Sequence, residues 1–377
     1  MNLLFVTDGI APFVTGGMQS HSTNMVRSLI KHVTQLTLIH CVPDNVEIPT
    51  ASEVCKKIGI EEEKINIYGF NFPEKGFLPG HYVRNSKDYS KTCFQAVKDS
   101  LDEFDLIYCQ GLTGSCFVKK HTKSLVITNL HGLEMFQKNA GLSSVLRSLI
   151  LRPISRIIIK HSPLTVSLGG KLTDILAKIR GTNEGIVVSY NGLNSDWVGH
   201  KRKNEDNEVT RFLFVGRNER RKGLYEIMQV ISELDSINAR FTFVGPIPET
   251  KGLPNVQFLG EIKDVERLRE IYSEHDVLLC PSWSEGMPTV IIEAMSMGLA
   301  IISTRVGAVE ELVSGSNGWL MEPGAKDELK QAILDALETN LDAKKDFSLE
   351  HSKKFQFDEI VKNLLAQVSG LRHKNRV

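Results

Sequence analysis

The feature that most constrains the fold is a repeated alternation between short, continuously apolar runs and longer stretches with helical periodicity. Helices cover both faces of a parallel sheet, so its strands are apolar throughout instead of alternating with polar residues. In the first half the pattern predicts a first crossover helix at Thr23–His32. It predicts strands at Leu3–Thr7, Leu36–His40, Leu106–Cys109, Ser124–Asn129, Leu164–Ser167 and Gly185–Ser189.

The pattern restarts in the second half at Arg211–Gly216. Further strands are predicted at Arg240–Gly245, Val256–Leu259, Val277–Cys280 and Ala300–Thr304. A chain of 377 residues is long for one core, so we expect two doubly wound α/β domains. The polar run Asn194–Thr210 is the expected linker. Ligands of such sheets bind beyond the carboxyl ends of the strands, so a cleft between the domains is the expected site.

Composition excludes several classes of protein. Lys plus Arg equals Asp plus Glu, 45 against 45, which gives no reason to expect a nucleic-acid partner. The six cysteines have no C-x-x-C spacing and are expected to be buried thiols, not disulfides or zinc ligands. The run Leu3–Thr7 is expected to be a strand and not a signal peptide, and no apolar stretch is long enough to span a membrane. We therefore expect a cytoplasmic protein.

The most informative stretch is Ser282–Gly298, which follows a predicted strand and opens a helix. Pro288 suits the first helical position, where its missing N–H costs nothing. The amides of Thr289 and Val290 then lie at the positive end of the helix dipole, which suits a diphosphate.

Two carboxylates, Glu285 and Glu293, flank this helix start, one in the loop and one inside the helix. Acidic groups beside a phosphate site are suited to accept hydrogen bonds from hydroxyls, for example on a sugar and a ribose. The alternative is a structural helix with two solvated glutamates. The spacing alone favours neither interpretation.

The segment Gly216–Gly223 directly follows the first strand of the second half. Arg217 offers a planar fork and Lys222 a point charge, a combination suited to a departing diphosphate, although a solvated basic turn is the alternative. Arg220 and Arg221 are expected to be surface residues.

Two weaker signals lie in the first half. Gly16 and Gly17, between the first strand and first helix, permit a close approach of backbone amides to a phosphate or sugar. His131 follows the strand that ends at Asn129 and is placed to bond a substrate hydroxyl, although a lone histidine is more often structural.

Taken together, these motifs resemble the family 4 retaining glycosyltransferases (glycosyl transferases group 1), which have the GT-B fold of two Rossmann-like domains facing across a cleft. Ser303–Leu312 and Phe258–Ile262 continue the resemblance, which covers essentially the whole chain; Ser189–Gly192 departs from the usual proline-asparagine-glycine. The matching residues are Gly16, Gly17, His131, Arg217, Lys222, Glu285 and Glu293.

The resemblance implies a role for each position. Arg217 and Lys222 would neutralise the leaving diphosphate, while His131 and Glu285 would contact the transferred sugar. Glu293 would bind the ribose. The remaining donor-binding positions would be Gly16, Gly17, Ile262, Gly286, Met287, Thr289 and Val290. The implied reaction moves a hexose-type sugar from a nucleotide-diphosphate sugar to a glycan or lipid-linked acceptor with retention. Basic side chains would replace a metal, and no cofactor is expected.

The resemblance also divides the chain. It implies an acceptor-side domain at 1–193, a nucleotide-sugar-binding domain at 194–352 and a segment 353–377. A helix near Phe355–Leu371 in that last segment would cross back to the N-terminal domain.

Leu142–Lys160 is both apolar and basic. It is either a basic amphipathic face for peripheral contact with the inner membrane surface or, as we prefer, two core helices broken near Pro153. Rival functions are a nucleotide-sugar epimerase with the same fold and a non-catalytic sugar-binding homologue. Surface polysaccharide or glycolipid synthesis is the expected context.

Overall fold

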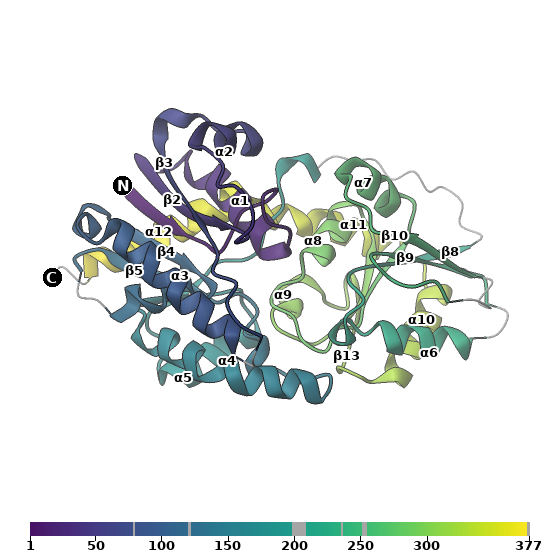
Figure 1. Cartoon of the computed structure of the whole chain (residues 1–377). Helices are drawn as coiled ribbons and strands as arrows, with labels where there is room; N and C mark the ends of the chain where they lie inside the picture. The colour runs from purple at the N-terminus through teal and green to yellow at the C-terminus, as the bar shows by residue number, and fades with distance from the viewer. Residues whose placement is uncertain (78–79, 120–121, 198–208, 235–236, 251–254, 375–377) are drawn as a thin grey trace. The chain divides into compact units, whose positions relative to one another are not determined.

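The computed structural model describes residues 1–77, 80–119, 122–197, 209–234, 237–250 and 255–374 (Figure 1). These residues form two compact units. Unit 1 comprises Met1–Phe136, Val145–Asn191 and Phe357–Val377, and unit 2 comprises Gln137–Ser144 and Gly192–Gln356. The charged part of the expected linker, residues 201–208, lies outside the described residues.

Unit 1 contains a seven-stranded sheet in the order β3-β2-β1-β4-β5-β6-β7, with parallel pairing throughout. Its strands are β1 Asn2–Val6, β2 Gln35–Val42, β3 Ile65–Asn71, β4 Leu106–Gln110, β5 Leu125–Asn129, β6 Leu164–Ser167 and β7 Ile186–Val188. The central strands are buried along their length, as expected for a sheet covered on both faces.

The helices of unit 1 connect these strands. They are α1 Gly17–Leu29, α2 Ala51–Ile58, α3 His81–Val97, α4 Leu142–His161, which begins in unit 2, α5 Lys171–Arg180 and α12 Phe357–Lys374. The first crossover helix begins at Gly17, six residues before its predicted start, so the predicted glycine loop includes the first residue of α1.

Although α12 is the last helix of the chain, it belongs to unit 1, where it packs beside α1 (Figure 1, yellow). Val361, Leu364 and Val368 join the same apolar core as strands β1 and β2. Asp358 accepts hydrogen bonds from Ser28 at 2.7 Å and from Lys31 at 2.8 Å. The chain thus returns to its first helix after completing unit 2.

Unit 2 contains a six-stranded parallel sheet in the order β10-β9-β8-β11-β12-β13. Its strands are β8 Thr210–Val215, β9 Ala239–Val244, β10 Val256–Gly260, β11 Val277–Cys280, β12 Ala300–Thr304 and β13 Gly318–Met321. Its helices are α6 Leu224–Ser232, α7 Val265–Ser273, α8 Thr289–Ser296, α9 Val309–Leu312, α10 Lys326–Glu338 and α11 Asp342–Ser352.

Strand order reverses between β1 and β4 in unit 1 and between β8 and β11 in unit 2. At such a switch point the two connections leave toward opposite faces and open a crevice at the carboxyl ends of the strands. The Gly16-Gly17 loop follows β1, while Arg217 and Glu285 follow β8 and β11. The main candidates from the sequence therefore lie beyond the carboxyl ends of the strands next to the two switch points.

Two strands were not predicted, and both lie at the edge of a sheet. In β3 only Ile65 is buried, the other residues are partly or fully exposed, and Gly69 interrupts the run. In β13 only four residues pair, and they include Gly318. Short or half-exposed edge strands lack the continuous apolar signal of the central strands.

The preferred interpretation of Leu142–Lys160 as two helices was wrong, because α4 continues through Pro153 as one helix. Proline removes one backbone hydrogen bond, to the carbonyl of Leu149. Leu149 is 56% exposed, so water can reach this turn of the helix. Other bonds tether the helix: Arg152 donates from Nε to the Met135 carbonyl at 2.6 Å, and Arg180 donates to the Ile159 carbonyl at 2.9 Å.

Candidate functional site

In unit 2 the loops after β8 and β11 are fastened together. The first loop ends in a single 3-10 turn, Arg220–Lys222, followed by Gly223 with φ 75°. A Cβ at Gly223 would lie 2.1 Å from the Pro281 carbonyl oxygen, so only glycine permits this approach. The amide of Trp283 donates to the Arg221 carbonyl at 2.7 Å. Lys222 is therefore held against the loop that carries Glu285.

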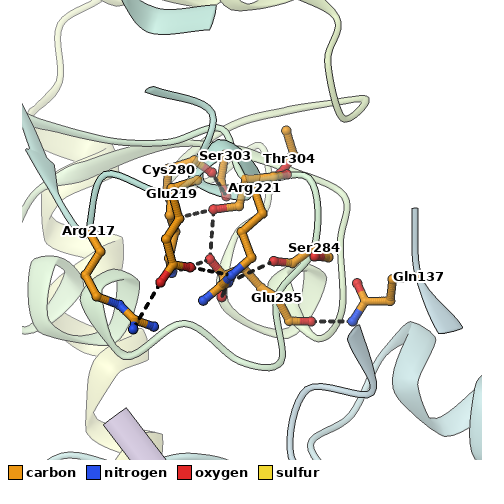
Figure 2. Close-up of polar contacts among 11 residues, drawn as sticks. Gln137, Arg217, Glu219, Arg221, Cys280, Ser284, Glu285, Ser303 and Thr304 are labelled. Atoms are coloured by element: carbon orange, nitrogen blue, oxygen red, sulfur yellow. Dashed lines mark hydrogen bonds and ion pairs between the residues drawn. The ribbon is translucent and has the colours of Figure 1, made fainter. Parts of the chain in front are cut away.

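The loop that carries Glu285 is also fixed from the β12 side. Gly307 has φ 52°, and a Cβ there would lie 2.2 Å from the Glu285 carbonyl oxygen. The amide of Ala308 donates to the Gly286 carbonyl at 2.8 Å. Thr304 Oγ1 donates to the Ser282 carbonyl at 2.5 Å, and Gln137 donates to the Glu285 carbonyl at 2.5 Å (Figure 2).

The charged side chains of the two loops form one connected network (Figure 2). Arg217 pairs with Glu219 at 3.0 Å, and Glu219 accepts from Arg221 Nε at 2.8 Å. Arg221 Nη1 lies 3.5 Å from Glu285 Oε2, and Lys222 Nζ donates to Glu285 Oε1 at 2.7 Å. The network carries three positive and two negative charges, so its net charge favours an anionic ligand.

Glu285 is the buried centre of this network, with 6% of its surface exposed. Burial alone would raise the pKa of its carboxyl, because charge is disfavoured away from water. The charges of Lys222 and Arg221, with hydrogen bonds from Lys222 and Ser282, outweigh burial and hold the pKa below its ordinary value. Glu285 is therefore ionised at neutral pH.

The prediction that Arg220 and Arg221 are surface residues was wrong for Arg221 and incomplete for Arg220. Arg221 is 21% exposed and bonds both Glu219 and Glu285. Arg220 forms a bidentate pair with Glu226 at 2.8 and 2.6 Å and lies over the Trp283 ring. Trp283 Nε1 donates to the same Glu226 at 3.1 Å, so this cluster links the loops after β8 and β11 to helix α6.

The helix that follows the second loop, α8, begins one residue later than predicted, at Thr289. Pro288 has ψ 117°, an extended conformation, and occupies the N-cap position. The cap supplies no side-chain hydrogen bond among the described residues. Thr289 and Val290 therefore provide the first helical amides, and Gly286 and Met287 lie in the loop before them.

Glu293 lies about one turn inside α8, and its carboxylate accepts two hydrogen bonds from neighbouring side chains. Tyr272 donates to Glu293 Oε2 at 2.9 Å, and Thr289 donates through its side chain. Burial raises the pKa of Glu293, while these two hydrogen bonds partly offset the rise. Ile262, the other predicted donor contact, is partly buried in the segment after β10.

In unit 1, the predicted glycine loop leads directly into α1. A Cβ at Gly16 would lie 2.2 Å from Gln19 Oε1, whereas one at Gly17 would meet nothing within 4 Å. Gln19 donates to Asp8 at 3.4 Å, so the two ends of the loop are joined across Gly16. Burial raises the pKa of Asp8 to about 6.

His131 adopts φ 54°, a left-handed conformation that is uncommon for residues other than glycine. Its amide donates to Asn129 Oδ1 at 2.8 Å, and Asn129 in turn donates to Tyr108 at 3.0 Å. Its ring contacts His21 edge to face, with centroids 5.0 Å apart. Burial lowers the pKa of His131 to about 4, so the ring is neutral at pH 7.

Among the described residues no group of His, Cys, Asp and Glu is arranged to hold a metal ion. The six cysteines are free, and all but the half-buried Cys116 are buried. No helix in the described part of the chain combines the length and apolar character needed to cross a membrane.

The fold is that of the GT-B glycosyltransferases. Sucrose-phosphate synthase from Thermosynechococcus elongatus superimposes with a TM-score of 0.78 at 15% identity, over 98% of both chains. Anabaena HepE in complex with UDP-glucose gives a TM-score of 0.68 at 17% identity, over 98% of this chain and 100% of that one.

Sequence comparisons agree with the fold. Residues 209–339 match the family model described as Glycosyl transferases group 1. An uncharacterized glycosyltransferase of Methanocaldococcus jannaschii is 25% identical over 80% of this chain and 84% of its own length. A Bacillus subtilis protein, named provisionally as a teichuronic acid biosynthesis glycosyltransferase, is 34% identical over 122 residues. That match spans 32% of this chain and 31% of the relative.

Several residues that shape the site gave no signal in the sequence. Tyr272 on α7 donates to Glu293 on α8, and Glu226 on α6 accepts from Trp283 in the loop after β11, so both contacts depend on the order of the strands. Gln137 is distant in sequence from Glu285, whose carbonyl it bonds. Arg221 was the exception: its position beside Lys222 and after a strand was a usable signal that the interpretation discounted.

Proposed function

We propose that this protein is a retaining, metal-independent glycosyltransferase that moves a hexose-type sugar from a nucleotide-diphosphate sugar to a glycan or lipid-linked acceptor. One observation carries the proposal. The net positive network around Glu285 lies at the switch point of the unit 2 sheet, immediately before the amino terminus of α8.

The diphosphate is assigned to Lys222, Arg217 and the first amides of α8. An ammonium group has three N–H donors, and Glu285 takes one from Lys222. The remaining donors allow Lys222 to bond a phosphate while it stays paired. Arg217 is exposed, and in the described part of the chain it pairs with Glu219 alone, so its guanidinium group can turn to a phosphate.

The two glutamates are assigned to hydroxyl groups. Glu293 is fixed by Tyr272 and Thr289, and a carboxylate held in this way is suited to accept from the ribose. Among the described residues, Glu285 Oε2 has a single long contact, with Arg221 at 3.5 Å, so it has capacity for a sugar hydroxyl. In unit 1, the Gly16-Gly17 loop is assigned to the donor phosphates and His131 to the sugar. The segment Phe258–Ile262, which comprises the end of β10 and the two residues after it, is assigned to the base.

In the proposed reaction, the bond between sugar C1 and the diphosphate oxygen breaks, and its electron pair leaves with the diphosphate. The acceptor oxygen forms a bond to C1 on the face that the diphosphate departs, and its proton passes to a diphosphate oxygen. Lys222, Arg217 and the α8 amides stabilise the developing negative charge. Under this scheme no side chain acts as a nucleophile.

The testing experiment begins with a thermal-shift screen of UDP, GDP, ADP and their sugars, because a ligand that binds the folded state raises the melting temperature. The donor that stabilises the protein is then incubated with glycan and lipid-linked acceptors in EDTA, and the anomeric configuration of the product is read by proton NMR. A product with the donor's configuration supports the proposal, and inversion or dependence on a metal refutes that part of it.

The same assay separates the rivals. Conversion of the nucleotide sugar into an isomer without acceptor would identify an epimerase. Binding without turnover would identify a sugar-binding homologue. The polysaccharide-related relative and the group 1 family match support transfer to a cell-surface glycan or glycolipid.

We also propose cytoplasmic localisation with peripheral membrane contact through α4. Leu146 and Leu149 on this helix are 55% and 56% exposed, and the helix carries basic residues but no acidic one. Sedimentation with vesicles that contain anionic lipid should fall when both leucines are changed to serine. Equal sedimentation of the variant would refute the contact.

A further inference from the structure

Among the described residues, no hydrogen bond orients the ring of His131 through its Nε2 atom. Such a ring is normally fixed by a hydrogen bond from the nitrogen that does not face the ligand. Here Nε2 of His131 is enclosed and has no hydrogen-bond partner in the described part of the chain. The Asn129 turn fixes the backbone at φ 54° but does not fix the ring.

The ring contact that His131 does make is with His21. The two rings lie edge to face, with centroids 5.0 Å apart and an interplanar angle of 88°, the geometry preferred by aromatic pairs. His21 lies on α1, has 6% of its surface exposed and contacts Phe357 of α12 at 5.4 Å on another side. Its ring is therefore confined between His131 and the last helix.

His21 is itself unusual, because neither of its ring nitrogens has a hydrogen-bond partner among the described residues. An enclosed, unpaired polar atom costs about 1–3 kcal/mol. The ring must therefore be neutral, and its packing is not explained by a hydrogen bond. Burial, together with the charge that His131 would carry, keeps the pKa of His21 far below its ordinary value.

We propose that His21 is a positioning residue for sugar transfer, whose flat, buried ring holds the imidazole of His131 in the orientation that meets a hydroxyl of the transferred sugar. The inference rests on the proposed function and adds a residue to it. His21 acts through His131 and does not touch the substrate.

The experiment compares two substitutions of His21 that differ in shape. His21→Leu fills much of the space without a flat ring, and His21→Phe retains a ring that can pack edge to face. Both remove the unpaired nitrogens, so both variants should fold. We expect His21→Leu to lower kcat about tenfold, equivalent to 1.4 kcal/mol, with the KM for the donor unchanged. His21→Phe should stay close to wild type.

His32→Leu is the matched control. Its Nε2 is also enclosed and unpaired in the described structure, but it lies beyond the other end of α1. It should leave kcat unchanged. In a His131→Ala background, His21→Leu should cause no further loss, because a positioning residue has nothing left to position.

Equal losses from His21→Leu in the wild-type and His131→Ala backgrounds would overturn the role, as would loss in His21→Phe as large as in His21→Leu. A wild-type kcat in His21→Leu would overturn it as well. If the unmodified protein transfers no sugar, the proposed function itself fails. The two failures are therefore distinguishable.

Discussion

The ion pair between Lys222 and Glu285 makes the sharpest prediction, because it separates stability from catalysis. At 2.7 Å and an effective dielectric constant of about 20, the attraction is about 6 kcal/mol before desolvation is subtracted. Breaking a buried pair by removing one partner typically costs about 3–5 kcal/mol. Lys222 is 18% exposed and Arg221 remains near Glu285, so we expect Lys222→Met to lower the free energy of unfolding by about 2–3 kcal/mol.

The matched variants are Glu285→Gln and the double mutant. Glu285→Gln should cost about 1 kcal/mol, because the lysine left behind can reach water. The double mutant should recover about half of the loss in Lys222→Met, since it leaves no buried charge unpaired. Urea unfolding at pH 7.5 measures the free energy of unfolding of all three variants. An unchanged slope of this free energy against urea concentration would show that they expose similar surface on unfolding.

The pH dependence supplies a second readout. The pKa of Glu285 is held below its ordinary value of 4.5, so the pair stabilises the protein above that value and the stabilisation is lost as pH falls through the lower folded pKa. The destabilisation of Lys222→Met should therefore be full at neutral pH and shrink in acid, where the unpaired carboxyl gains a proton.

Activity should not follow stability. The double mutant should regain stability but remain at least about a hundredfold slower than wild type, a barrier increase of about 2.7 kcal/mol, because the charge opposite the diphosphate is still absent. A stable double mutant with wild-type transfer would show that the Lys222 charge is not needed for the reaction. The pair would then be a structural contact only.

Three further changes have defined outcomes. Tyr272→Phe should weaken UDP binding, because Glu293 loses the hydroxyl donor that orients it. The control variant Tyr225→Phe should bind UDP as the wild type does. Calorimetric titration compares the two variants, and equal affinities would contradict the assignment of Glu293 to the ribose. Gly307→Ala should greatly reduce transfer, since its Cβ would meet the Glu285 carbonyl at 2.2 Å, whereas Gly315→Ala should be tolerated. Asp8→Asn should raise the melting temperature at pH 8 but not at pH 4. Because the pKa of Asp8 is raised from 3.8 to about 6, its charged form lowers the free energy of unfolding by at most roughly 3 kcal/mol above pH 6. The same change in melting temperature at both pH values would show that Asp8 is not buried in its charged form.

The sequence predicted the central strands well because burial on both faces leaves a continuous apolar signal. Val277–Cys280, Ala300–Thr304 and Leu164–Ser167 have the predicted bounds. The edge strands β3 and β13 escaped because they are short or half exposed. Local sequence patterns do not show which strands pair when the strands are distant in sequence, as β8 and β11 are.

The site shows the same division. The loop residues Lys222 and Glu285 were recognised as candidates because both follow strands, and because a lysine suits a phosphate and a carboxylate suits a sugar hydroxyl. Their supporting contacts were not, since Tyr272 reaches Glu293 from another helix and Gln137 reaches the Glu285 carbonyl from a distant segment. Contacts of this kind depend on the folded arrangement of the chain.

The diphosphate site is tested most directly by a crystal structure of the protein with UDP or GDP, whichever raises its melting temperature more. We expect the β-phosphate to lie within hydrogen-bond distance of Lys222 Nζ and of the amides of Thr289 or Val290, with the ribose hydroxyls on Glu293. A diphosphate bound elsewhere, with Lys222 and Glu285 paired as they are here and no phosphate at α8, would contradict this expectation.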